Sequence, residues 1–352
     1  MEERLFFYEL MHWFSLNRRN DPWSGTSDPY PVWISEIMLQ QTVVSAATPY
    51  FMAWMSRFPT FSHVAFAPEE EILRLWEGLG YYSRARNIRR TALILVSEGR
   101  RTLPSTYREL CSLPGIGNNT ARAILSLAFG QKYPVLDANV RKIFMRIFLE
   151  EEWTKETAAR TDRFIREGMK HYHPGRVNEA LMQFGQSVCL RKKARCTVCP
   201  LSCCCEAYRS GREDSIPPAA VKKVTRKKTV LLIPAWQKTL GILKREEGIG
   251  RGLWTFPGLS YERGKACLDL LQEKRSADIF PLKREIHTYT RFRDELFPFL
   301  LVFKDKGGFS AMLREKALKP VLLDELDSFP FLSAYRKIAG EIKSLLEGDI
   351  SR

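Results

Sequence analysis

Residues Leu110–Gly130 read LCSLPGIGNNTARAILSLAFG, and this stretch decides the fold expected for the first half of the chain. It contains the end of one helix, a tight turn from Leu113 to Gly117, and a second amphipathic helix that begins near Asn118. In a Gly-x-Gly turn, the backbone N–H groups that open the next helix can point outward and donate to a phosphate oxygen. The residues therefore predict a helix-hairpin-helix element over 110–130 that binds the DNA backbone, with contacts expected at Leu113, Gly115 and Gly117.

The charge of the chain is the second reason to expect DNA as the partner. The 352 residues include 55 Lys and Arg against 40 Asp and Glu, a formal net charge of +15. Basic side chains gain affinity for nucleic acid by releasing the counterions condensed on it, although an anionic membrane surface would also attract them. A Gly-x-Gly turn can also be only a tight connection. Taken together, the turn and the charge favour DNA.

The sequence gives no sign of membrane insertion or secretion. No apolar run approaches the roughly 20 residues needed to span a bilayer, and the start, MEERLFFYELMHWF, has acidic residues where a signal peptide would be basic. We expect a soluble, cytoplasmic monomer that does not associate with membranes.

Six of the eight cysteines lie in the loop Cys189–Cys205, which reads CLRKKARCTVCPLSCCC. Such a set in one short loop favours a metal or an iron–sulfur cluster in a reducing compartment over a disulfide framework. The spacing selects Cys189, Cys196, Cys199 and Cys205 as ligands, with gaps of six, two and five residues. These gaps disfavour zinc, whose ligands are usually two to four residues apart, but the residues alone leave either metal possible. Cys203 and Cys204 leave the fourth ligand open.

Two carboxylates occupy unusual positions. Glu36 interrupts the apolar helix predicted over Val32–Gln41, and Asp137 lies at the mouth of the helix that begins in LDANV. A lone acid on an apolar helix is either solvated or held in a pocket for a function. An Asp at the start of a helix is most often a cap, although here it lies shortly after a turn expected to bind phosphate.

A glycine-rich turn in GLGYYSRARN presents Tyr81 and Tyr82 beside two arginines. Aromatic side chains in such a place can wedge into a duplex or stack on its bases, although they can also simply pack a helix junction.

The composition changes after the cysteine loop. Residues 1–210 have helical periodicity, residues 211–228 read as a linker because they combine a Pro-Pro pair with a basic run, and short β-type runs begin at Thr229. We expect an all-α domain over 1–210, with the cluster loop at 189–205, followed by an α+β domain over 229–350.

Together these motifs resemble the adenine-specific mismatch DNA glycosylases of the MutY type, within the helix-hairpin-helix glycosylases. The resemblance rests on WISEIMLQQT, LWEGLGYYSRARN, LPGIGNNTARAILSLAFG, LDANV and the cysteine loop, and it spans nearly all of residues 20–206. It implies a 4Fe-4S cluster in the loop. The C-terminal half resembles more loosely, through GLWTFPGL and HTYTRFRDELFP, the Nudix-like recognition domain of that family.

The resemblance also implies roles for individual residues. Glu36 would be the general acid that protonates adenine, and Asp137 would stabilise the sugar cation, a division that suits cleavage of an N-glycosidic bond. Asn139 would help to hold the carboxylates and the sugar. Further positions are implied at Glu179, which would contact adenine, and at Gln41 and Tyr81, which would wedge into the duplex.

The sequence departs from the family at several positions. Asn119 stands where the related endonuclease III type has the lysine nucleophile of a lyase, so no Schiff-base step is expected and a DNA contact is expected instead. In the C-terminal half, Tyr289, Thr290 and Arg291 replace the Phe-Ser-His loop that reads 8-oxoguanine. The segment GLSYERGKACLDLLQEK lacks the Glu-rich Nudix metal motif, so recognition without pyrophosphate hydrolysis is expected.

The leading hypothesis is a monofunctional base excision repair enzyme that removes adenine opposite 8-oxoguanine or guanine in double-stranded DNA after flipping it out of the stack. The alternatives are a bifunctional enzyme of the endonuclease III type and a damage-binding scaffold without catalysis. Asn119 argues against the first alternative, and the presence of both carboxylates argues against the second.

Overall fold

The computed structural model describes residues 2–218, 224–289 and 292–348. The chain forms two compact units, the first comprising Met1–Phe66 with Asn87–Ala220 and the second comprising Ala67–Arg86 with Val221–Arg352. Each unit is described by itself below. None of the helices within the described ranges is long and apolar enough to cross a membrane.

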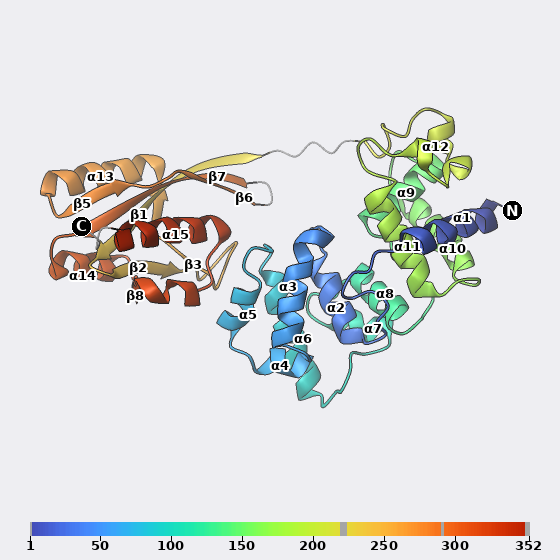
Figure 1. Cartoon of the computed structure of the whole chain (residues 1–352), viewed down its shortest axis with the longest axis horizontal. Coiled ribbons are helices and arrows are strands. Elements are labelled where there is room, and N and C mark those ends of the chain that lie inside the picture. The colour runs from blue at the N-terminus through green and yellow to red at the C-terminus, as the bar shows by residue number, and fades with distance from the viewer. Residues whose placement is uncertain (1, 219–223, 290–291, 349–352) are drawn as a thin grey trace. The chain divides into compact units, whose positions relative to one another are not determined.

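The first unit is built from helices (Figure 1). In chain order they are α1 (Glu2–Asn17), α2 (Pro29–Met38), α3 (Val44–Arg57), α4 (Phe61–Phe66), α6 (Ser83–Ser97, whose first turn falls in the second unit), α7 (Tyr107–Ser112), α8 (Asn118–Leu127), α9 (Ala138–Phe148), α10 (Lys155–Gly168), α11 (Pro174–Ser187) and α12 (Glu206–Arg209). Two short 3-10 turns, Cys196–Val198 and Ser202–Cys204, lie in the cysteine loop. The expectation of a helical domain is confirmed.

An aromatic core holds α1 against α9, α10 and α11. Phe6 of α1 packs edge-on against Phe164 of α10 and lies 5.7 Å from Phe144 of α9, while Trp13 packs edge-on against Phe184 of α11. Burial of each large apolar side chain contributes about 1.5–3 kcal/mol. This cluster fixes the helix on which Asp137 lies.

The helix-hairpin-helix element forms where the sequence predicts it. Helix α7 ends at Ser112 and α8 begins at Asn118. Gly115 adopts φ +80°, a region that favours glycine, and a Cβ there would lie 2.7 Å from the Cβ of Asn87. Both the conformation and the space therefore require glycine in this turn.

Helix α2 is shifted from its predicted range. The Asp28 side chain accepts a hydrogen bond from the Tyr30 N–H at 2.9 Å, and Pro29 occupies the first helical position, so the helix starts three residues before Val32. It ends at Met38 rather than Gln41, because the chain turns there and Gln41 adopts a left-handed backbone with φ 61°.

The second unit contains a mixed sheet flanked by helices (Figure 1). The strand order is β3-β2-β1-β7-β5, with β4 paired to β1, β6 to β7 and β8 to β2. The strands are β1 (Thr225–Trp236), β2 (Thr239–Lys244), β3 (Trp254–Thr255), β4 (Gly258–Ser260), β5 (Ala277–Pro281), β6 (Glu285–Tyr289), β7 (Phe292–Phe303) and β8 (Lys319–Leu322). The helices are α5 (Glu69–Leu75), α13 (Tyr261–Lys274), α14 (Lys306–Glu315) and α15 (Ser333–Gly348).

The first strand begins earlier than the sequence suggests. Residues 225–228, expected to belong to the linker, extend β1 and pair in parallel with β7, with Thr225 opposite Phe292. Long-range pairing with β7 overrides the local basic composition here.

The glycine-rich turn of the second unit is held by an ion pair and by hydrogen bonds. Glu77 accepts hydrogen bonds from the Arg336 guanidinium and from the Phe331 N–H. Tyr82 is buried, with 6% of its surface exposed, whereas Tyr81 has a left-handed backbone with φ 48° and is 43% exposed. Tyr82 therefore packs the helix junction, whereas the Tyr81 side chain is exposed enough to wedge into a duplex as predicted.

A close helix contact in the first unit leads to our first prediction. Gly185 of α11 lies against the start of α9, and a Cβ there would come within 2.7 Å of the Asn139 Cβ. We expect Gly185→Ala to lower the free energy of unfolding by about 1–3 kcal/mol through overpacking. Urea unfolding followed by far-UV circular dichroism measures this.

Gly340→Ala in α15 is the matched control. A Cβ at Gly340 meets no atom within 4 Å, so the change should stabilise the helix by about 0.5–1 kcal/mol. Equal effects of the two substitutions would contradict the proposed contact.

Candidate active site

A broad groove with a volume of about 2100 Å³ crosses the first unit. It is lined by α2 and the turn after it, by the hairpin and α8, and by the starts of α9 and α11. Most of the residues predicted for the site meet here, namely Glu36, Gln41, Gly115, Gly117, Asn119, Asp137, Asn139 and Glu179. Leu113 is buried, with 7% of its surface exposed, so its predicted DNA contact stays a prediction.

Glu36 has the properties of an acid that is protonated near neutral pH. Burial, together with repulsion from the nearby Asp137 and Glu179, raises the pKa of its carboxyl to about 7. Helix α2 is fixed relative to the hairpin helix, because the Gln40 amide donates to the Thr120 hydroxyl at 3.2 Å. A carboxyl fully exposed to water would keep an ordinary pKa, so the interpretation of Glu36 as a solvated surface acid is not supported.

Asp137 caps α9 and lines the groove at the same time. Its Oδ1 accepts from the Val140 N–H at 2.8 Å, and its Oδ2 accepts from Asn139 Nδ2 at 2.9 Å. The capping and functional interpretations are therefore compatible, because the bonds that stabilise the helix also fix the carboxylate in the groove. Asn139 thus contacts one of the two carboxylates, and its implied contact with the sugar stays a prediction.

Sequence reasoning missed the basic residues of the groove. Arg18 Nη2 lies 3.1 Å from Glu179 Oε2 and forms an ion pair with it. Further cationic side chains line the groove: Arg19, Arg122, Arg141, Lys142 and Arg176. These residues are scattered over the sequence, and Arg18 and Arg19 lie outside the helices, so no local motif marks them as a set.

The four cysteines selected by spacing surround one small cavity. Cys189, Cys196, Cys199 and Cys205 line it together with Arg146, whereas Cys203 is exposed. Burial, with a smaller contribution from the neighbouring thiols, raises the pKa of Cys196 to about 11 and of Cys199 to about 12. Thiols that disfavour each other's ionisation are suited to a cationic metal centre, which would stabilise all four thiolates.

The donor set therefore fits the cluster that the resemblance implies. Arg146 of α9 is 1% exposed and donates to Cys189 Sγ at 3.2 Å and to the Leu190 carbonyl at 2.7 Å. In the part of the chain that the structure describes, no group of three or more His, Cys, Asp or Glu side chains is already arranged to hold a single metal ion.

Two predicted positions of the recognition loop lie outside the described residues. These are Thr290 and Arg291, and of the third, Tyr289, the structure gives the backbone at the end of β6. Their predicted contact with 8-oxoguanine stays a prediction.

The raised pKa of Glu36 generates a prediction about stability. In the unfolded chain this carboxyl has an ordinary pKa near 4.5, whereas in the folded protein it is about 7. Between these values the folded state holds a proton that the unfolded state has lost, so stability falls as the pH rises from about 4.5 to about 7. We expect Glu36→Gln to be more stable than the wild type by roughly 1–3 kcal/mol at pH 8, and the difference to shrink toward pH 4.5.

Urea titrations at several pH values without DNA measure this difference. Glu167→Gln is the control, since Glu167 forms an exposed ion pair with Lys170 and its removal should change stability by less than about 1 kcal/mol. A Glu36→Gln effect that does not depend on pH would show that the carboxyl titrates normally.

Comparison with known proteins agrees with this geometry. Residues 34–168 match the family described as HhH-GPD superfamily base excision DNA repair protein. The adenine DNA glycosylase of Buchnera aphidicola subsp. Baizongia pistaciae is 35% identical over 264 residues, which cover 73% of this chain and 74% of that protein. The adenine DNA glycosylase of Homo sapiens is 29% identical over 361 residues, covering 83% of this chain and 66% of that protein.

A solved structure of a thermostable thymine-DNA glycosylase has the same helical fold. It superposes with a TM-score of 0.54 at 24% identity and covers 59% of this chain and 97% of that one. Sequence, fold and groove geometry agree, and the chain belongs to the adenine DNA glycosylase family, within the HhH-GPD superfamily of base excision DNA repair proteins.

Proposed function

We propose that this protein is a monofunctional DNA glycosylase that hydrolyses the N-glycosidic bond of adenine mispaired with 8-oxoguanine or guanine. The observation that best supports the proposal is the pair formed by Glu36, whose pKa is raised to about 7, and Asp137, whose carboxylate is fixed in the same groove. Relatives covering most of the chain are named adenine DNA glycosylases, which supports adenine as the base removed.

The two carboxyl groups would act on opposite ends of the breaking bond. The adenine is flipped out of the duplex into the groove, at a cost of a few kcal/mol that mispairing reduces. Glu36 donates its proton to the adenine ring as the C–N bond breaks and its electron pair leaves with the base. The carboxylate of Asp137 stabilises the positive charge that develops on the sugar, and water then attacks the anomeric carbon and gives up a proton to Glu36.

The remaining groove residues would bind and orient the substrate. Asn139 donates to Asp137 and keeps it directed into the groove, and Glu179 would contact the adenine. The hairpin and exposed cationic side chains of the groove such as Arg176 would bind DNA phosphates, and the gain in affinity would come from counterion release. Gln41 and Tyr81 would wedge into the duplex, and Tyr289, Thr290 and Arg291 would read the base opposite adenine in a Nudix-like domain. We expect the protein to act as a monomer.

The cysteine loop would hold a 4Fe-4S cluster through Cys189, Cys196, Cys199 and Cys205. Each iron of such a cluster takes one thiolate, so no position is left for substrate, and the role we propose is structural. The cluster would close the loop against α9 and present Arg191, Lys192, Lys193 and Arg195, all of which are exposed, to DNA phosphates.

Substitution of Glu36 tests the catalytic proposal. We expect Glu36→Gln to abolish adenine release from a duplex with an adenine–8-oxoguanine pair while binding stays within a few fold of the wild type, because the amide cannot donate a proton to the ring. Asp137→Asn should also reduce release strongly. Single-turnover gel assays and fluorescence anisotropy measure the two quantities.

The wild-type rate should fall as the pH rises through about 7, since Glu36 must be protonated to act. Unchanged release by Glu36→Gln would overturn this assignment.

A panel of duplexes containing adenine, thymine glycol or uracil separates the alternatives. Covalent trapping with borohydride would indicate a lyase, and binding without any abasic product would indicate a scaffold.

Iron and sulfide analysis tests the cluster. We expect about four irons and four sulfides per chain, and loss of the brown colour and of DNA binding in Cys196→Ser. Cys203→Ser is the matched control and should keep both, because Cys203 is exposed and does not line the cavity. Full activity without bound iron would contradict a structural role.

A further inference from the structure

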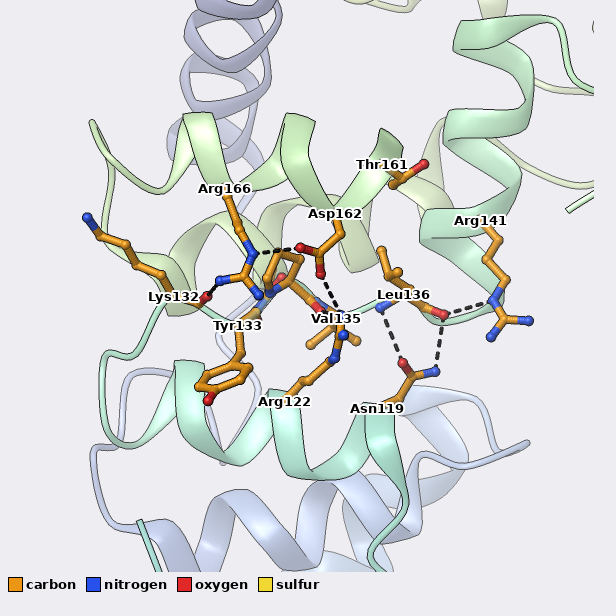
Figure 2. Close-up of polar contacts among 12 residues, drawn as sticks. Asn119, Arg122, Lys132, Tyr133, Val135, Leu136, Arg141, Thr161, Asp162 and Arg166 are labelled. Carbon is orange, nitrogen blue, oxygen red and sulfur yellow. Dashed lines mark hydrogen bonds and ion pairs between the residues drawn. The ribbon is translucent and has the colours of Figure 1, made fainter. Parts of the chain in front are cut away.

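The segment Gln131–Leu136 joins α8 to α9 and ends directly at Asp137, yet it forms neither helix nor strand. Backbone groups in such a segment need partners, since an unpaired buried N–H or C=O costs free energy. The N–H groups of Gln131 and Tyr133 donate to backbone carbonyls, and the other partners described below are side chains from the surrounding helices. This is the arrangement drawn in Figure 2.

The first part of the segment is held from α8, α10 and α11. Arg166 donates to the Lys132 carbonyl, and Arg122 donates to the Pro134 carbonyl at 2.9 Å. Asp162 lies between the two guanidinium groups and accepts from both, at 2.8 Å from Arg122 and 2.6 Å from Arg166 (Figure 2). The buried Asn178 side chain bonds both the Tyr133 carbonyl and the Val135 N–H.

The last residue before Asp137 is held by Asn119. Its Nδ2 donates to the Leu136 carbonyl at 3.1 Å, and its Oδ1 accepts from the Leu136 N–H at 3.3 Å (Figure 2). Arg141 Nε donates to the same carbonyl at 2.9 Å. The amide of Asn119 therefore fixes the two peptide groups on either side of the Leu136 Cα, and the second of these contains the backbone nitrogen of Asp137.

We propose that Asn119 is a positioning residue that sets the orientation of Asp137. This rests on the proposed function and deepens it, because it assigns a role to the position where the related endonuclease III type has the lysine of a lyase. Asn119 fixes the backbone at Leu136, and the capping bond to the Val140 N–H fixes the Asp137 side chain. The carboxylate is therefore oriented before DNA binds. Misplacement of a charged group by about 1 Å can cost on the order of 100-fold in rate.

A positioning role and a direct DNA contact of Asn119 predict different effects on binding affinity and on cleavage rate. Loss of a phosphate or base contact weakens binding, whereas loss of positioning slows bond cleavage in the bound complex. We expect Asn119→Ala to lower the single-turnover rate of adenine release by about 10- to 100-fold. Affinity for the adenine–8-oxoguanine duplex should change by less than about threefold.

A second variant tests whether the paired hydrogen bonds themselves matter. In Asn119→Asp the introduced carboxyl can replace the amide only when it is protonated, because a neutral acid has one donor and one acceptor whereas a carboxylate cannot donate. We expect the ratio of the variant rate to the wild-type rate to be low at pH 8 and to rise as the pH falls toward 5. A purely structural defect would not give this rescue.

Asn17→Asp is the matched control, since it makes the same chemical change at an exposed residue that does not line the groove. Its rate ratio should not rise at low pH. Weakened binding with a normal rate in Asn119→Ala, or a rate ratio for Asn119→Asp that does not depend on pH, would overturn the proposal. If wild-type protein releases no adenine, the proposed function fails, and this inference fails with it.

Discussion

The hydrogen bond from the Val140 N–H to Asp137 Oδ1 is the contact around which the functional half of the molecule is arranged. It begins α9, and it holds a carboxylate at the edge of the groove. The elements that meet at this point come from distant parts of the sequence. Asn119 of α8 holds Leu136, the residue before Asp137. Gly185 of α11 leaves space for Asn139, whose side chain donates to Asp137. Helix capping and site geometry are therefore the same constraint.

The two carboxyl groups differ because their surroundings differ. Glu36 lies on an apolar helix, where burial and the neighbouring acids raise its pKa to about 7. Asp137 accepts two hydrogen bonds at the start of a helix. One group is thus suited to donate a proton near neutral pH, and the other is suited to face a developing positive charge.

Helix α9 also connects the groove to the cysteine loop. Arg146, two turns after Asp137, is almost fully buried and bonds Cys189 Sγ and the carbonyls of Leu190, Arg191 and Ile216. A buried guanidinium is costly unless its donors are satisfied, and here the loop supplies the acceptors. Ile216 therefore packs in the first unit, although the sequence pattern predicts a linker from residue 211 onward.

The sequence by itself determined the helical character of the first half, the hairpin at Leu113–Gly117, and the types of residue that form the site. These follow from local signals, because periodicity, glycine in a left-handed turn and cysteine spacing act over a few residues. Only the tertiary structure decided that Glu36 lies half-buried in the same groove as Asp137, that Asn119 faces Leu136, and that β1 starts at Thr225 through pairing with β7. Each of these depends on contacts between residues far apart in the chain, and neither burial nor strand pairing of that kind is encoded in a local pattern.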